Sequence, residues 1–145
     1  MTGTQQYCTF YVDGRYFGLD VRKVQEVIRY QEMTRVPLAP SVVRGLVNLR
    51  GQIVTAIDLR RRLELSDRPA DQLPVNVVVP TDDGPISLLV DEIGDVLDVE
   101  DKLVEPAPDT LVGTARELIC GVCKLTDRLM LLLDIDKALQ LGSEE

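Results

Sequence analysis

Short apolar runs separated by turn residues dominate the hydrophobic pattern of the chain. Cys8–Val12 and Val77–Pro80 are two such runs, and each is followed by a turn rich in aspartate and glycine. Arg44–Leu49 and Gln52–Asp58 have the same character and flank the dipeptide Arg50-Gly51. Strand-like runs bounded by tight turns are typical of β-hairpins. The pattern therefore predicts a chain built mainly of short strands.

The same pattern occurs twice along the chain. Residues 6–30 align with residues 75–99 at an offset of 69, and residues 45–63 align with residues 121–139 at an offset of 76, both without a gap. Two segments that recur in the same order indicate an internal duplication. The larger second offset predicts a slightly longer connection within the second half.

The second alignment also matches residues that set backbone geometry. Gly45 meets Gly121, and Asp58 meets Asp134. Each aspartate follows a predicted strand and is placed to cap a short helix. The first of these helices contains Arg60-Arg61-Arg62, which we interpret as a solvated helix face that pairs with nearby carboxylates, because the chain as a whole is acidic.

Arg50 is the part of this hairpin that the second half lacks. Its turn, Arg50-Gly51, aligns with Thr126-Asp127, so the hairpin is duplicated and the arginine is not. Glu26 lies in the run "VQEV" after a short turn. From these residues alone, Arg50 is either an incidental surface arginine or an arginine that docks a partner, since arginine is enriched at interface hot spots.

The repeat predicts an all-β fold made of two related halves, approximately residues 6–65 and 75–139. The Pro- and Asp-containing stretch 66–74 would link them. Each half should hold about five short strands, the number that closes a small barrel. A barrel of about 65 residues buries too little surface to be stable alone, so the halves should pack on each other. A short C-terminal helix is expected over approximately residues 135–141.

Composition excludes several classes of function. The chain of 145 residues contains no histidine, which removes Ser-His and Cys-His nucleophilic pairs and imidazole metal sites. A net charge of −8 argues against nucleic acid as a partner. Neither a secretion signal nor an apolar run long enough to span a bilayer is apparent. Three cysteines in such a chain suggest a reducing compartment, so we expect a soluble cytoplasmic protein with no direct membrane insertion.

Three patterns that could carry chemistry have simpler explanations. Gly45 and Gly51 are not followed by the Gly-Lys-Ser/Thr of a phosphate-binding loop. Cys120 and Cys123 form a CxxC, but Cys123 aligns with the apolar Val47, which indicates a core position. The carboxylates near strand ends are better explained as caps and turn formers than as general acids and bases. We therefore expect no catalytic residue, no metal and no cofactor.

The sequence resembles the CheW family of bacterial chemotaxis adaptors nearly from end to end. The resemblance is carried by "FYVDGRYFGLDVRKVQEVI", "VVRGLVNLRGQIVTAIDLRRRL", "ISLLVDEIGDVLDV", "VEPAPD" and "GVCKLTDRLMLLLDIDKAL". Its most specific part is "RGLVNLRG" with the strand that follows. Thr55 departs from the proline that many relatives carry after Ile-Val.

The resemblance implies two SH3-like five-stranded β-barrels packed around a shared hydrophobic core, with short helices. It also implies a non-catalytic adaptor that couples methyl-accepting chemoreceptors to the regulatory domain of the histidine kinase CheA, recruited to receptor arrays at the inner face of the membrane. An adaptor of a non-flagellar system, such as pili or gliding, is an alternative. A small-ligand barrel or an enzyme is a third interpretation, which the absence of histidine disfavours.

By correspondence with the family motifs, five positions face the receptor: Val24, Glu26, Gly45, Asn48 and Arg50. The resemblance implies that the receptor's helical hairpin tip lies in a groove between the barrels. Val24 would supply apolar contact, and Glu26 and Arg50 would fix orientation. Gly45 would allow close approach or a local bend. The kinase-binding residues are not assigned.

Overall fold

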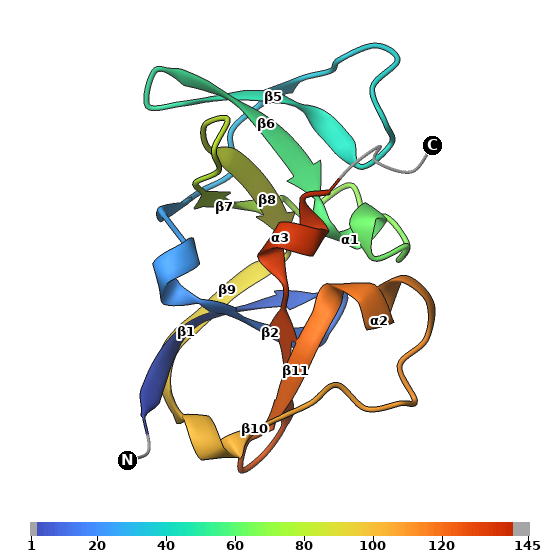
Figure 1. Ribbon diagram of the computed structural model, residues 1–145. Coiled ribbons are helices and arrows are strands. Elements are labelled where there is room, and N and C mark those ends of the chain that lie inside the picture. Colours follow the sequence, from blue (N-terminus) through green and yellow to red (C-terminus); the bar gives the residue numbers. More distant parts are fainter. Residues whose placement is uncertain (1–2, 141–145) are drawn as a thin grey trace.

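The computed structural model describes residues 3–140, and strands are its main elements (Figure 1). The strands are β1 (Thr4–Val12), β2 (Arg15–Asp20), β3 (Glu26–Ile28), β4 (Met33–Thr34), β5 (Val43–Leu49), β6 (Gln52–Asp58), β7 (Val75–Val79), β8 (Ile86–Val90), β9 (Glu92–Glu100), β10 (Val104–Glu105), β11 (Ile119–Lys124) and β12 (Leu129–Leu133). Three short helices are α1 (Leu59–Arg62), α2 (Gly113–Leu118) and α3 (Ile135–Ala138), and 3-10 turns lie at Val21–Lys23 and Asp101–Leu103. The predicted all-β class is confirmed.

The strands form two sheets that curl into barrels, one below the other in Figure 1. The first barrel has the strand order β10-β11-β12-β2-β1-β9, and the second has the order β3-β7-β8-β6-β5-β4. The two edge strands of each sheet are joined by only three or four residues, so each sheet must roll until its edges meet. β9 and β10 are therefore two parts of one bent strand, as are β3 and β4. Counted in this way, each barrel has five strands, as predicted.

The boundary between the barrels differs from the predicted boundary between the halves. β1 and β2 belong to the first barrel together with β9–β12, whereas β3–β6 share the second barrel with β7 and β8. The two halves of the sequence therefore exchange strands between the barrels. Two parallel pairs join the exchanged strands: β12 pairs with β2, and β6 pairs with β8. Thus the divisions 6–65 and 75–139 describe the duplicated sequence, but neither closes its own barrel. Residues 66–74 connect α1 to β7 within the second barrel.

The core between the barrels is shared, as predicted. Phe10 and Phe17 from the first barrel lie in one buried cluster with Leu88 and Val90 from the second. Alternate residues of β7 and β8 face opposite ways, because side chains alternate across a strand. Val78 and Leu89 accordingly point into the second barrel instead, where they pack with residues such as Val47 and Val54. Strands buried on both faces explain the continuous apolar runs in the sequence.

The duplication is visible in the backbone. β5 carries a register shift between Val43 and Gly45, and β11 carries one between Ile119 and Gly121. The side chain of Asp58 accepts a hydrogen bond from the Arg60 N–H at the start of α1. Asp134 accepts one from the Lys137 N–H in α3. Both predicted caps are confirmed. α3 ends at Ala138, and residue 141 of its predicted span lies outside the described residues.

Arg60 of the arginine triplet does not lie on a solvated face, contrary to the sequence-based interpretation, whereas Arg61 and Arg62 are partly exposed. Arg60 is buried, and its Nη2 lies 2.6 Å from Asp91 Oδ2. Arg68, from the connection between α1 and β7, is also buried and contacts both Asp91 and Asp58 at 3.0 Å. Arg44 contacts Asp58 from the partly exposed side at 3.0 Å. The partner of Arg60, Asp91, comes from a segment 31 residues away, so the triplet alone did not reveal it.

The other two arginines of the triplet also have structural partners. The Arg61 guanidinium donates to the Ser41 carbonyl and to Asp67. Arg62 Nε donates to the Ala138 carbonyl, which ties α1 to the end of α3. All three arginines therefore support the fold, and each does so by donating specific hydrogen bonds. Among residues 3–140, no helix has the length and apolar character needed to cross a membrane.

Candidate functional site

The turn between β5 and β6 holds Arg50 at its tip. Arg50 and Gly51 have φ angles of 54° and 85°. Two consecutive left-handed residues match the two-residue hairpin turn that follows the natural twist of the strands. Asn48 Oδ1 accepts a hydrogen bond of 2.9 Å from the Gly51 N–H. Asn48 therefore fixes the turn, and the turn fixes the direction in which Arg50 leaves the backbone.

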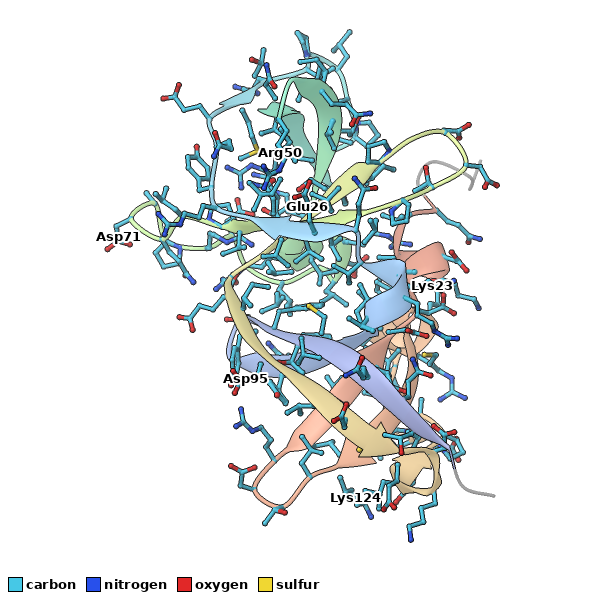
Figure 2. The ribbon with its side chains drawn as sticks, turned by 90° about the vertical axis from the view of Figure 1, so that its left-hand side faces the viewer. Lys23, Glu26, Arg50, Asp71, Asp95 and Lys124 are labelled. Carbon is cyan, nitrogen blue, oxygen red and sulfur yellow. The ribbon has the colours of Figure 1, made fainter. Side chains whose placement is uncertain are left out.

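Arg50 and Glu26 meet across the second barrel. Arg50 Nε donates to Glu26 Oε1 at 3.0 Å, and Figure 2 shows the two side chains next to each other. Glu26 pairs with Val78, whose side chain lies inside this barrel, so the ion pair lies over the end of the barrel interior. The Arg50 side chain is 73% exposed, while that of Glu26 is 32% exposed.

This ion pair orients the Arg50 side chain but adds little to the stability of the fold. An exposed pair of this kind contributes about 0–1 kcal/mol to folding, because water screens it and both side chains lose freedom. Among the described residues, the Arg50 Nη1 and Nη2 groups donate no hydrogen bond. Glu26 thus holds the guanidinium by one nitrogen and leaves its outer donors facing solvent, where a carboxylate or carbonyl of another protein could accept them.

Gly45 serves the backbone of the hairpin. It is buried, and its φ angle of 154° lies in the range that L side chains rarely adopt. A Cβ placed there would collide with the Thr34 carbonyl of β4. A Cβ at Gly121 would lie 3.0 Å from the Glu105 carbonyl of β10, which is a less severe contact. Gly45 is therefore explained by packing against β4, within the strand that leads to the Arg50 turn.

Val24 lies on the segment that leads into β3. It follows the 3-10 turn Val21–Lys23, and its N–H donates to the Val21 carbonyl at 3.2 Å. Its side chain is half-buried against the central core between the barrels. The structure therefore brings Glu26, Asn48 and Arg50 together, and it keeps Val24 two residues from Glu26 on the same segment. Gly45 is buried in β5 and does not join them.

Two apolar residues next to this site were not predicted from the sequence. Ile53 is 63% exposed and pairs directly with Asn48 across the hairpin. Val27 is 40% exposed and follows Glu26 in β3. Side-chain alternation in the segment Gln52–Asp58 was the available signal for Ile53, since Val54 and Ala56 face inward. Ile53 is therefore exposed apolar surface beside Asn48, whereas Val27 faces away from Glu26, because neighbouring side chains of a strand alternate.

The cysteines do not form a metal or thiolate site in the part of the chain that the structure describes. Cys123 is buried inside the first barrel, at the position that Val47 occupies in the second, as predicted. Burial raises the pKa of Cys120 and of Cys123, so both thiols stay protonated at neutral pH. Residues 3–140 contain no cluster of three cysteine, aspartate or glutamate side chains that could hold a metal ion.

Comparison with known proteins adds the family. A family model described as CheW-like domain matches residues 6–142. The chain is 34% identical over 141 residues to the chemotaxis protein CheW of Klebsiella aerogenes, which covers 97% of this chain and 84% of that protein. It is 28% identical over 141 residues to CheW of Bacillus subtilis, covering 97% of this chain and 90% of that protein.

A solved structure shows the same fold. The crystal structure of scaffolding protein TtCheW from Thermoanaerobacter tengcongensis superimposes with a TM-score of 0.86, covering 99% of this chain and 97% of that one, at 23% sequence identity. The agreement extends over both barrels, because nearly the whole of each chain is covered. With the family match over residues 6–142, it follows that the chain belongs to the CheW-like domain family.

Proposed function

We propose that this protein is a non-catalytic chemotaxis scaffold that couples methyl-accepting chemoreceptors to the histidine kinase CheA. Membership of the CheW-like family supports the scaffold role. The single observation that carries the receptor-binding part is the exposed Arg50, held by Glu26 on a hairpin whose duplicate lacks the arginine. The protein would act in the cytoplasm and be recruited to receptor arrays at the inner face of the membrane.

The receptor would contact the second barrel at the Arg50 turn. Glu26, Asn48 and Arg50 offer a carboxylate, an amide and free guanidinium donors, and Ile53 offers apolar surface beside Asn48. A helical hairpin presents a row of side chains three and four residues apart, which suits a shallow surface with an apolar margin and polar groups that set orientation. Val24 would extend the apolar contact, and Gly45 would support the hairpin from within β5.

The kinase would be bound elsewhere on the protein through its regulatory domain. Receptor and kinase must be held at the same time for coupling, so their surfaces on this small chain cannot coincide. The barrel arrangement supports this division, since the two barrels present different strands and different turns to solvent.

The experiment is to replace Arg50 by alanine and measure sedimentation of the purified protein with receptor-containing membranes, first without kinase. We expect the fraction bound by R50A to fall at least tenfold at limiting concentration, as for loss of one interface arginine worth about 1.5–3 kcal/mol. Stimulation of CheA autophosphorylation in reconstituted arrays should fall with it.

The matched control is Arg128→Ala, which removes an arginine from the duplicated hairpin. This variant should sediment with receptors like the parent protein. Equal binding of R50A and the parent protein would contradict the receptor assignment, while binding lost to the same extent in both variants would show that the turn is not specific. Failure of the parent protein to bind any receptor or CheA would contradict the scaffold proposal itself.

A further inference from the structure

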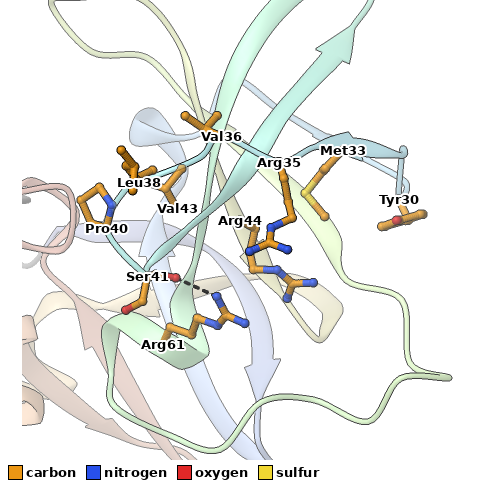
Figure 3. Close-up of a pocket in the computed structure, with 11 residues that line it drawn as sticks. Tyr30, Met33, Arg35, Val36, Leu38, Pro40, Ser41, Val43, Arg44 and Arg61 are labelled. Carbon is orange, nitrogen blue, oxygen red and sulfur yellow. Dashed lines mark hydrogen bonds between the residues drawn. The ribbon is translucent and has the colours of Figure 1, made fainter.

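A hollow on the second barrel collects arginine side chains from three separate elements. It has a volume of about 590 Å³ and lies between the loop that follows β4, the start of β5 and the helix α1 (Figure 3). Arg35 reaches it from the end of β4, Arg44 from β5 and Arg61 from α1. No aspartate or glutamate is among the described residues that line it. This concentration of positive charge stands out in a chain whose net charge is −8.

The arginines of this hollow are only partly neutralised. Asp58 is the partner of Arg44 but also accepts from the buried Arg68, so one carboxylate serves two guanidinium groups. Arg44 uses only Nη1 for this contact. Within residues 3–140, Arg35 forms no ion pair and donates no side-chain hydrogen bond. Arg61 is already paired with Asp67 and the Ser41 carbonyl, so the donors without a partner among the described residues are those of the exposed Arg35 and the remaining donors of Arg44.

Its walls are already formed without a ligand. The segment Val36–Ala39 makes a turn in which the Ala39 N–H donates to the Val36 carbonyl at 3.4 Å, with Pro37 at the second position. Leu38 takes the third position with a φ of 66°, a conformation that costs a non-glycine residue free energy and so marks a constrained loop. Arg61 also donates to the Ser41 carbonyl at 2.8 Å, which fixes the far end of the loop.

A second hollow continues the first. It has a volume of about 140 Å³, shares Tyr30 and Arg44 with the larger one, and is lined by Arg68. The planar guanidinium group matches phosphate and carboxylate oxygens in pairs. A volume of several hundred Å³ suits a small molecule. The chemistry is therefore that of a ligand with two or more phosphate or carboxylate groups.

We propose that this hollow is a binding site for a small multivalent anion, with Arg35 and Arg44 as its ligands and with Arg61 holding the loop at the far end through the Ser41 carbonyl. The site shares no residue with the Arg50–Glu26 surface, so the proposal stands independently of receptor binding. Arg35 would act as the free cation that the anion neutralises, and Arg44 would exchange part of its contact with Asp58 for the ligand.

The test is calorimetric titration of the full chain with pyrophosphate and with citrate at low ionic strength, where charge interactions are least screened. We expect saturable binding of at least one of these anions, and the two arms separate phosphate from carboxylate recognition. Backbone amide shifts in ¹H–¹⁵N spectra should centre on Arg35, Ser41 and Arg44. No saturable binding of either anion, or shifts centred elsewhere, would overturn the proposal.

The decisive variant is Arg35→Gln, which leaves the ion pairs of the fold intact. We expect its affinity for the anion to fall about tenfold or more, as for loss of a charge-assisted contact. Arg116→Gln removes the same charge from an exposed arginine on α2 and should change the affinity less than twofold. Equal losses in both variants would mean that the anion responds only to net charge and would overturn the site. Binding of a glutamate-rich peptide with no binding of pyrophosphate or citrate would also overturn it.

Discussion

The hairpins β5–β6 and β11–β12 are duplicates whose tips have diverged. At the first tip, Arg50 is mostly exposed and is held from outside by Glu26. At the second, Arg128 lies over the ring of Tyr16 at 4.3 Å and donates to the Tyr11 hydroxyl. One arginine points its free donors to solvent, while the other is folded onto its own barrel. Duplication has preserved the strands and changed what the turns present.

The carboxylate partners have diverged together with the arginines. Glu26 aligns with Asp95 in β9, at an offset of 69. Asp95 takes part in no ion pair among residues 3–140, whereas Glu26 pairs with Arg50. Glu26 and Asp95 therefore differ in their surroundings, because only Glu26 is paired with an arginine, which comes from the β5–β6 hairpin. This pairing, and not the carboxylate alone, distinguishes the two barrel ends.

The largest expected difference between the halves is at the helix caps. Asp58 caps α1 and also accepts from Arg44 and Arg68, so Asp58→Ala leaves the partly exposed Arg44 without its carboxylate and the buried Arg68 with Asp91 alone. We expect a loss of about 3–5 kcal/mol in unfolding free energy. Asp134→Ala removes only a cap, and a loss of about 1 kcal/mol is expected. Urea denaturation of both variants measures this; losses of equal size would contradict the role given to Arg44 and Arg68.

The next largest difference between the halves is expected at Gly45 and Gly121, the glycines at the two register shifts. Gly45→Ala meets both the positive φ and the Thr34 carbonyl, and we expect about 2–4 kcal/mol of destabilisation. In Gly121→Ala the added Cβ would lie 3.0 Å from the Glu105 carbonyl at an ordinary φ, so about 1 kcal/mol is expected. Chemical denaturation at equal protein concentration compares them. If Gly121→Ala proves the more damaging, the backbone of the two bulges is not as described.

Acid should act on the second barrel through Asp91, whose aligned position in the first half is Arg22. Burial tends to raise the pKa of Asp91, but hydrogen bonds from Arg60, the Asp13 N–H and Arg68 outweigh it and lower the pKa. A carboxyl whose pKa is lowered by folding stabilises the protein above its unfolded pKa, and this stability is lost as the pH falls below about 4.

Thermal melting at a series of acidic pH values tests this. The parent protein should lose stability steeply below about pH 4. Asp91→Asn should be less stable at neutral pH and should show a shallower acid dependence. An unchanged slope in this variant would mean that other carboxylates cause the acid dependence.

The smallest expected effect concerns the two tip arginines. Arg50→Ala should change the unfolding free energy by less than about 1 kcal/mol, because its ion pair is exposed. Arg128→Ala loses a cation–π contact and a hydrogen bond, which together should cost about 1 kcal/mol. Differential scanning calorimetry resolves the difference. Substantial destabilisation by Arg50→Ala would show that this arginine serves the fold.

Local features of the fold could be predicted from the sequence because they have local causes. Asp58 and Asp134 predict their helix caps, and Arg50-Gly51 predicts its turn. Strand exchange could not be predicted in this way. The contact of β2 with β12 joins Phe17 to Leu131 by a parallel pair with no turn between them, and an apolar strand does not specify its partner.

The candidate site was predictable to a similar extent. Arg50 was identified because the second half of the repeat lacks it, and the receptor-binding role of its neighbour Glu26 was implied by the family resemblance. Ile53 was not found, because it aligns with Leu129 and apolar matches suggest a common core. Both residues in fact face solvent. Arg60 was predicted to be solvated but is buried. Its partner Asp91 is 31 residues away in the chain, so the local sequence did not indicate the pair.

Strand exchange has a consequence for the order of assembly during synthesis. The second barrel uses strands from β3 to β8, so it can close once residue 90 has left the ribosome. The first barrel needs β1 and β2 from the start of the chain and β12, which ends at Leu133. The face of the β1–β2 hairpin that lines the first barrel and carries Tyr16 must therefore wait for Cys123 and Met130, until almost the entire chain exists. The barrel bearing Arg50 is complete first, and the barrel that the N-terminus begins is finished last.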